Sequence, residues 1–167
     1  MDLRVLPFDD PDAVKLTEEV QEEYVVRYGD RDLSSIDATE FTPPQGLFLV
    51  GYSEGTPVAC GGWRSHPVPP PGLRAGDAEI KRMYVVESAR GNGFARTVLA
   101  ELERTAAAAG HRRMVLETGL KQPEAIALYR SSGYVEIPKF GYYRDHETSR
   151  CFAKELQSSP ENRSHAD

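Results

Sequence analysis

The sequence predicts a mixed α/β domain, and three observations lead to this fold class. Segments typical of strands occur together with three segments that have helical spacing. Turns that carry glycine or proline separate most of these segments. In the middle of the chain a strand is followed by a helix and another strand, which requires one parallel crossover. The expected order is strand, helix, three strands, helix, strand, helix and two strands.

The first half of the chain begins with a short strand at residues 3–6 and a helix that starts near Asp12. Aspartate can cap a helix start, and Gly29 is suited to end the helix. Residues 30–46 are polar and carry Pro43-Pro44, so they are expected to form a loop with room for one short helical turn. Three strands follow, at residues 47–52, 58–64 and 78–86, with a proline-rich surface loop at residues 66–76 before the third.

The second half of the chain begins with a long helix at residues 92–109 that is rich in alanine and leucine and is closed by Gly110. A strand at 113–118 precedes a short helix at 123–132, which has proline in its first turn. Two last strands are expected at 134–137 and 149–156. Residues 1–156 are therefore interpreted as a single domain, and residues 157–167 as a polar, disordered tail.

The composition excludes several classes of protein. The chain has 167 residues, 40% of them hydrophobic and 28% charged, which suits one globular domain. A net charge of −6 argues against a general nucleic-acid binder. No apolar run reaches the roughly 20 residues of a membrane span, and the N-terminus does not have the pattern of a signal peptide. We therefore expect a cytoplasmic protein with neither a nucleic-acid nor a membrane partner.

The cysteines and histidines indicate no special chemistry. Cys60 and Cys151 are expected to be free, buried thiols in a reducing compartment, with a disulfide as the less favoured alternative. The four histidines have no metal-ligand spacing, and the two cysteines lie far from any metal-binding pattern. The sequence therefore predicts no metal.

The most informative segment is AEIKRMYVVESARGNGFARTVLAELE at residues 78–103, in which a strand leads through a glycine turn into the long helix. The first amides of a helix have no intrahelical partner, and the helix dipole adds positive charge there, so this junction can bind a diphosphate. Gly91 and Gly93 would let the backbone approach phosphate oxygens, and Arg90 and Arg96 would add charge. The alternative is a plain link whose glycines serve turn geometry. The dinucleotide fingerprint does not fit, because Arg96 stands where it needs glycine, and the G-x-x-x-x-G-K-[ST] phosphate loop is absent.

The turn RGNGFA at residues 90–95 matches R/Q-x-x-G-x-G/A, and the chain thereby resembles the GNAT superfamily of N-acetyltransferases, whose coenzyme A signature this is. A second landmark of that superfamily is the LYRSSGY block at residues 128–134, and the resemblance covers roughly residues 47–156. It implies a central, mostly antiparallel sheet that splays between its fourth and fifth strands and is flanked by helices. It also implies an enzyme that uses acetyl-coenzyme A as co-substrate.

The resemblance implies a set of coenzyme-binding residues. Backbone groups of Met83, Tyr84 and Val85 on the fourth strand would pair with the pantetheine arm like an added strand. Gln122 stands where many relatives carry an asparagine that contacts the pantetheine, and its side chain is one methylene longer. The diphosphate would lie at the glycine turn and the helix start, with the contributing residues Arg90, Gly91, Asn92, Gly93, Phe94, Ala95 and Arg96. Lys121, Arg112 and Arg113 are interpreted as a solvated basic edge rather than as contacts to a coenzyme phosphate.

Two catalytic residues follow from the resemblance. Glu79 opens the fourth strand, where the histone-acetylating branch of the superfamily has a general base, and a carboxylate can take the proton that an amine must lose. The alternatives for Glu79 are a solvated side chain or an ion pair with Lys81 or Arg82. Alternation along this strand would place Glu79, Lys81, Met83 and Val85 on one face. Tyr129 matches a tyrosine that often protonates the coenzyme A thiolate, and the alternative is an aromatic residue packed on the sheet.

The sequence therefore predicts direct transfer of acetyl from acetyl-coenzyme A to a primary amine, either a small molecule or a peptide, in a ternary complex. No cysteine or serine stands in a nucleophile motif, which argues against a covalent acetyl-enzyme. A non-catalytic acyl-coenzyme A sensor of the same fold and a nucleotide-binding module are the rival interpretations. No motif identifies the acceptor, and because many relatives dimerise, a homodimer is left open.

Overall fold

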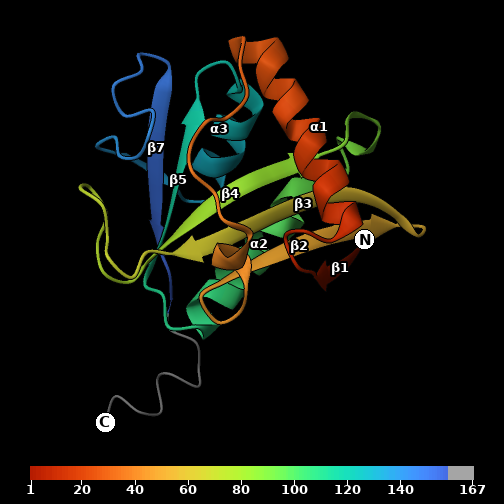
Figure 1. Cartoon of the computed structure of the whole chain (residues 1–167), viewed down its shortest axis with the longest axis horizontal. Coiled ribbons are helices and arrows are strands. Elements are labelled where there is room, and N and C mark those ends of the chain that lie inside the picture. Colours follow the sequence, from red (N-terminus) through yellow and green to blue (C-terminus); the bar gives the residue numbers. More distant parts are fainter. Residues whose placement is uncertain (158–167) are drawn as a thin grey trace. The chain divides into compact units, whose positions relative to one another are not determined.

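The computed structural model describes residues 1–157, and its helices and strands follow the predicted order (Figure 1). The ends differ from the predicted ones by at most two residues. The strands are β1 (Asp2–Val5), β2 (Gly46–Ser53), β3 (Thr56–Ser65), β4 (Asp77–Val85), β5 (Arg113–Gly119), β6 (Val135–Ile137) and β7 (Ser149–Glu155). The helices are α1 (Pro11–Tyr28), α2 (Phe94–Ala108) and α3 (Pro123–Ser131), with short 3₁₀ turns η1 (Ala38–Phe41) and η2 (Glu87–Ala89). Residues 158–167 of the predicted disordered tail lie outside the described residues.

The strands form one mixed sheet in the order β1-β2-β3-β4-β5-β7-β6, which confirms the predicted fold class. The pairs β1–β2, β2–β3, β5–β7 and β6–β7 are antiparallel. The pair β4–β5 is parallel and joins residues 77–79 to residues 113–115. This parallel pair is the predicted crossover, since α2 connects the two strands.

The chain forms two compact units. The first unit contains residues 1–64 and 80–102, and the second contains residues 65–79 and those from 103 onward. Both β4 and α2 therefore contribute residues to each unit. The single domain expected over residues 1–156 stays a prediction.

The first unit buries apolar side chains on both faces of its strands. On one face, Ala13 and Leu16 of α1 pack with Phe48 and Val50 of β2 in a cluster that also contains Phe41 of η1. The opposite face of β3 lies against α2, because a Cβ added at Gly61 would approach side-chain atoms of Val98 and Leu102 at 3.2 Å. Figure 1 accordingly shows α1 on one face of these strands. Burial on both faces explains why β2 and β3 read as nearly continuous apolar runs.

The N-cap residue of helix α1 lies two residues earlier than the sequence suggested. Asp10, not Asp12, is the N-cap residue, and its side chain accepts a hydrogen bond from the amide of Asp12. Pro11 occupies the first turn, where a missing N–H costs nothing. Asp12 instead accepts a hydrogen bond from the hydroxyl of Tyr52 in β2. The predicted end of the helix is confirmed, since Gly29 adopts a left-handed conformation with φ of 82°.

The second unit is organised around β5 and β7. Val115, Phe140, Cys151 and Ala153 form its apolar cluster. Arg113, at the start of β5, donates from Nε and Nη2 to the two carboxylate oxygens of Asp77 at 2.8 and 2.7 Å. Both residues are buried, so the prediction of a solvated basic edge is wrong for Arg113. The guanidinium of Arg113 can be buried here because the two oxygens of the Asp77 carboxylate match it in charge and geometry.

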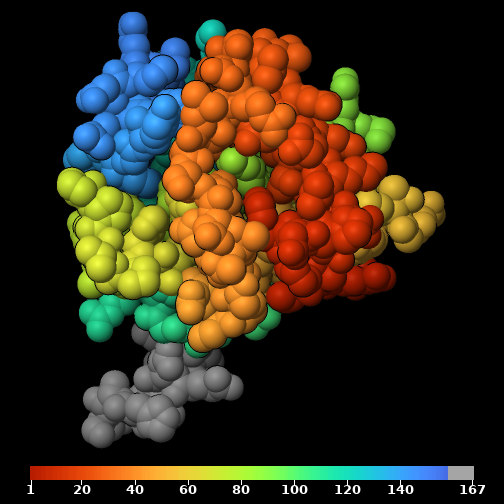
Figure 2. Space-filling view, in the orientation of Figure 1, coloured from red at the N-terminus to blue at the C-terminus, as the bar shows by residue number. Residues whose placement is uncertain are grey.

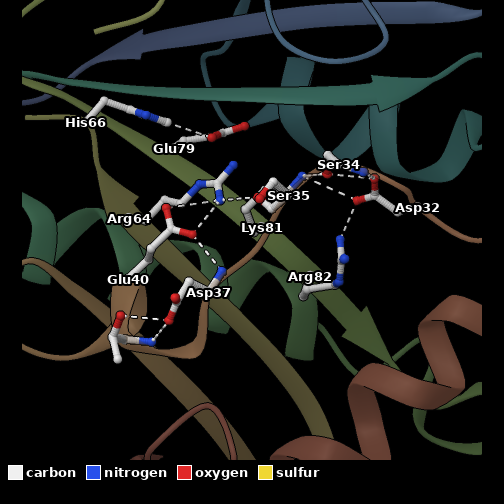
Figure 3. A network of polar contacts seen from close by, with 11 residues as sticks. Asp32, Ser34, Ser35, Asp37, Glu40, Arg64, His66, Glu79, Lys81 and Arg82 are labelled. Atoms are coloured by element: carbon white, nitrogen blue, oxygen red, sulfur yellow. Dashed lines mark hydrogen bonds and ion pairs between the residues drawn. The ribbon is translucent and has the colours of Figure 1, made fainter. Parts of the chain in front are cut away.

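Residues 30–37 are fastened to β4 by an ionic cluster within the first unit (Figure 3). Asp32 forms ion pairs with Arg82 and with Lys81, whose Nζ lies 3.3 Å from Oδ2. Lys81 Nζ also donates to the hydroxyl of Ser34 at 3.0 Å, and Ser34 donates to Asp32 Oδ1 at 2.6 Å. In the space-filling view of Figure 2, atoms with the colour of β4 are visible in an opening beside this segment and α1.

Asp32 is held ionised by its surroundings. Burial alone would raise the pKa of this carboxyl, but the charges of Lys81 and Arg82 and the hydrogen bonds from Ser34 outweigh burial and lower it well below its usual range. A lowered pKa in the folded state adds stability above the unfolded pKa and loses it as the pH falls through the folded pKa.

We expect Asp32→Asn to lower the free energy of unfolding at pH 7 by about 3 kcal/mol, because it leaves the buried charges of Lys81 and Arg82 without their carboxylate. The stability difference from the wild type should be full above about pH 5 and shrink below about pH 4, near the unfolded pKa of aspartate. Urea titrations at several pH values measure both effects. The matched control is Asp30→Asn, since Asp30 is an exposed aspartate of the same segment. Equal losses in the two variants would contradict an anchoring role for Asp32.

Candidate functional site

The glycine turn before α2 leaves its backbone open on one side. Gly91 and Gly93 have φ of 85° and 76°, a region that favours glycine, so turn geometry is by itself a sufficient reason for both. A Cβ added at either position would meet no heavy atom within 4 Å. The amide of Thr97 makes the first α-helical bond, to the carbonyl of Gly93 at 3.1 Å, so the amides of residues 94–96 precede the hydrogen-bonded ladder. The turn therefore presents backbone donors at the positive end of a 15-residue helix.

Two side chains brace this turn from within the first unit. Asn92 donates from Nδ2 to the carbonyl of Ala89 at 2.9 Å. Arg90 donates from Nε to the carbonyl of Val85 and from Nη2 to Glu23 of α1, both at 2.9 Å. Of the two arginines predicted to add charge beside an anion, Arg90 thus already has a carboxylate partner on α1.

The end of β4 departs from simple alternation. Arg82 has φ of 60°, a left-handed conformation that is uncommon for a residue with a Cβ. Lys81 and Arg82 both reach Asp32, whereas Met83 lies against Gly61 on the α2 face and Tyr84 packs on the cluster under α1. The prediction that Lys81 and Met83 share one face is therefore wrong, because the left-handed residue between them resets the alternation. Met83, Tyr84 and Val85 are half-buried.

Glu79 is a buried carboxylate of the second unit with a histidine beside it (Figure 3). Its Oε1 lies 2.8 Å from Nε2 of His66, which follows β3 directly. Only 5% of Glu79 is exposed, so the solvated alternative is wrong. The alternative of an ion pair with Lys81 or Arg82 is replaced by the pairing of those residues with Asp32.

Two neighbouring tyrosines in the second unit differ in how their hydroxyls are used. Tyr129 of α3 and Tyr134 are buried, and their rings meet edge to face with centroids 5.7 Å apart. Tyr134 donates its hydroxyl to Glu103 at 2.8 Å. Among residues 1–157, no hydrogen bond involves the hydroxyl of Tyr129. Burial raises the pKa of Tyr129 above its ordinary value, so this phenol stays protonated at neutral pH and is available as a donor.

The remaining predicted residues are distributed over both units. Gln122 is the N-cap residue of α3, and its side chain does not cap the helix. Phe94, Ala95 and Arg96 form the first turn of α2. Cys60 and Cys151 are free and buried, as predicted, and burial raises the pKa of the Cys151 thiol to about 11.

Sequence reasoning missed two residues, Asp32 and His66. His66 was considered only as a metal ligand, and Asp32 lies in a segment with no motif. A weak signal existed for His66, because a following proline restricts its backbone and can hold a side chain in place. Within the described residues 1–157, no group of three or more histidine, cysteine or acidic side chains is arranged to hold a metal, and the absence of a metal stays a prediction. No helix in the same part of the chain is long and apolar enough to cross a membrane.

The geometry suits anion binding in one unit and proton transfer in the other. The turn at residues 90–93 offers open backbone beside a helix N-terminus in the first unit. The second unit holds a buried carboxylate with a histidine neighbour and a buried phenol without a hydrogen-bond partner among the described residues. The turn fits a diphosphate, because the space that a side chain would fill at its two glycines is empty of protein atoms.

Comparisons with known proteins find sequence and structural similarity over most of this chain. The sequence profile described as acetyltransferase (GNAT) family matches residues 13–134. A curated protein named IAA acetyltransferase from Azospirillum brasilense is 34% identical over 144 residues, which span 86% of this chain and 90% of that protein. The structure of a putative acyl-CoA N-acyltransferase from Klebsiella pneumoniae aligns with a TM-score of 0.76 at 26% identity and covers 93% of this chain and 97% of that one.

A further solved structure shows a similar fold with its ligand present. It is the PaiA N-acetyltransferase of Thermoplasma acidophilum in complex with coenzyme A, with a TM-score of 0.65, 15% identity and coverage of 93% of this chain and all of that one. At that identity it supports the fold alone. The profile match spans most of the described residues, and together with the identity to the Azospirillum protein it shows that this chain belongs to the acetyltransferase (GNAT) family.

Proposed function

We propose that this protein is an N-acetyltransferase that moves the acetyl group of acetyl-coenzyme A to a primary amine by direct attack. The observation that carries the proposal is the open glycine turn at the start of α2, where two left-handed glycines face space free of protein atoms. Family membership supports the choice of coenzyme, and the Thermoplasma structure of similar fold contains coenzyme A. The acceptor is a small molecule or a peptide.

The turn and the first turn of α2 would hold the diphosphate. Backbone amides of residues 94–96 donate without competing with the helical ladder, and the helix dipole favours a negative charge there. Arg96 is exposed on the same helical turn and would add a full positive charge. Arg90 plays a different part, because its contacts with Val85 and Glu23 fix the shape of the turn.

The proton transfers are assigned to residues of the second unit. An alkyl amine has a pKa of about 10, so it must lose a proton before its nitrogen can attack the thioester carbon. We assign Glu79 as the base that accepts this proton, directly or through a water. As the new C–N bond forms and the C–S bond breaks, Tyr129 would donate its phenolic proton to the departing sulfur, and the second proton that the nitrogen loses on becoming an amide would restore the phenol. The raised pKa of Tyr129 ensures that the phenolic proton is present.

The cellular setting and partners belong to the same proposal. The two free, buried thiols suit a reducing cytoplasm. The net charge of −6 argues against a nucleic-acid partner and suits a cationic acceptor. The relatives are named for acceptors as different as IAA and a ribosomal-protein alanine, so their names do not select an acceptor for this chain.

We predict that Gly93→Ala weakens coenzyme A binding by about tenfold, the size of one lost hydrogen bond to a charged group. The added methyl group would stand where phosphate oxygens approach the backbone. Isothermal titration with coenzyme A measures the effect. The matched control is Gly55→Ala, because Gly55 has φ of 80° and also has nothing within 4 Å of its added Cβ. Both variants should lose about 1–2 kcal/mol of stability from left-handed strain, and only the first should lose affinity. If both variants had the same affinity for coenzyme A, the proposal that the diphosphate binds at this turn would be wrong.

We predict that Tyr129→Phe lowers kcat by about 100-fold while leaving the Kd for coenzyme A unchanged, because it removes the proton donor and keeps the ring. The thiol released from acetyl-coenzyme A in the presence of a panel of amines measures kcat. The control is Tyr134→Phe, which removes a hydroxyl bonded to Glu103 and should lower stability by about 1 kcal/mol without a comparable loss of kcat. A protein that binds coenzyme A but turns over none of the amines, with or without Tyr129, would instead be a sensor.

A further inference from the structure

His66 lies in hydrogen-bond contact with Glu79 in a largely buried part of the second unit. The distance between His66 Nε2 and Glu79 Oε1 is 2.8 Å, and the exposed fractions of the two side chains are 18% and 7% (Figure 3). An ionised carboxylate can only accept hydrogen bonds, so Nε2 carries the proton in this contact whenever Glu79 is ionised. The hydrogen bond from His66 thus fixes the position of Oε1, one of the two carboxylate oxygens of Glu79.

The loop that carries His66 is held at both of its ends. The residue after His66 is Pro67, which restricts the backbone of His66 to extended conformations. Further along, Arg74 donates its amide to Asp77 Oδ2 at 2.7 Å, and Asp77 is itself locked to Arg113. Gly72 packs against Phe140, where an added Cβ would lie 3.1 Å from the Cβ of Phe140. These contacts make His66 part of a braced loop, so its imidazole can orient Glu79 at little entropic cost.

Three other ionisable groups act on the same part of the second unit. Burial, and then the carboxylates of Glu117 and Glu79, raise the pKa of Cys151, while the backbone hydrogen bond from Phe140 and the charge of Lys139 oppose that rise. Glu117 comes from β5, Cys151 from β7 and Lys139 from the loop after β6. They stay in place when His66 is changed, so a difference between the wild type and a His66 variant reports on the imidazole.

We propose that His66 is a positioning residue for the acetyl transfer, which holds Oε1 of Glu79 and so fixes the orientation of the carboxylate that accepts the proton of the amine. This inference rests on the proposed role of Glu79 as base. The neutral imidazole donates its Nε2 proton to Oε1 and keeps it throughout. The proton of the acceptor goes to the carboxylate of Glu79.

The test is a double-mutant cycle on kcat/KM with His66→Leu, Glu79→Gln and the two changes combined. We expect Glu79→Gln to lower kcat/KM about 100-fold and His66→Leu about tenfold. In the Glu79→Gln background, His66→Leu should cost less than about twofold, because there is no carboxylate left to position. His111→Gln is the control, because His111 is a half-buried histidine that interacts with the backbone of Gly76 and Asp77, and it should leave kcat/KM unchanged.

Rescue by a conservative variant provides a readout that a merely structural role would not move. In His66→Gln the amide can still donate a hydrogen bond to Oε1, so kcat/KM should stay within about threefold of the wild type. If His66 acted only through packing, His66→Gln and His66→Leu should lose similar activity. This variant decides the matter if His66→Leu does not fold.

The outcomes separate the two proposals. If Glu79→Gln keeps the wild-type rate, Glu79 is not the base and the role of His66 is overturned with it. If Glu79→Gln is impaired but the loss from His66→Leu is the same in both backgrounds, or His66→Gln loses about tenfold or more of kcat/KM, only the role of His66 is overturned.

Discussion

Strand β4 places three charged side chains in the protein interior, and each needs a partner there. Asp77, Glu79 and Arg82 are only 3%, 5% and 7% exposed. A buried charge without a partner costs several kcal/mol, so the chain must bring an opposite or hydrogen-bonding group to each one. Asp77 receives Arg113 of β5, Glu79 receives His66, and Arg82 receives Asp32. These three partners tie a strand and two loops to β4 and thereby shape the surroundings of the candidate site.

The three pairs differ in whether they can exchange protons. An arginine is always charged, so the pairs Arg113–Asp77 and Arg82–Asp32 can only stabilise the carboxylate in its ionised form. The pKa of Asp32 is accordingly lowered. Histidine is the side chain whose charge changes near neutral pH, and it neighbours the one carboxylate among the three that is assigned to accept a proton. The choice of partner therefore separates two carboxylates suited to anchoring from one suited to proton transfer.

Local signals in the sequence predicted the elements and the glycine turn because these depend on nearby residues. Gly29 ends α1, and the turn at residues 90–95 leads into α2, as the sequence indicated. The partners of β4 could not be predicted in the same way. Arg82 pairs with Asp32, which lies 50 residues earlier in the sequence, and Arg113 pairs with Asp77, which lies 36 residues earlier. Both pairs are brought together by tertiary packing, which the periodicity of the sequence does not reveal. The left-handed backbone conformation of Arg82 could not be predicted for a related reason, since a residue with a Cβ adopts this conformation only where the surrounding structure enforces it.

The two tyrosines of the LYRSSGY block show how one motif can serve both folding and chemistry. The amide of Tyr134 donates to the carbonyl of Tyr129 at 3.0 Å, so the end of α3 sets the spacing of the two rings. Tyr134 gives its hydroxyl to Glu103, which also binds Lys154, and this contact fastens β7 and α2 residues within the second unit. A phenol that is hydrogen-bonded to a carboxylate cannot readily donate its proton to another group, whereas the hydroxyl of Tyr129 has no such hydrogen bond among the described residues. Because burial keeps both phenols protonated, the hydrogen-bond partner, not the pKa, distinguishes the structural tyrosine from the proposed acid.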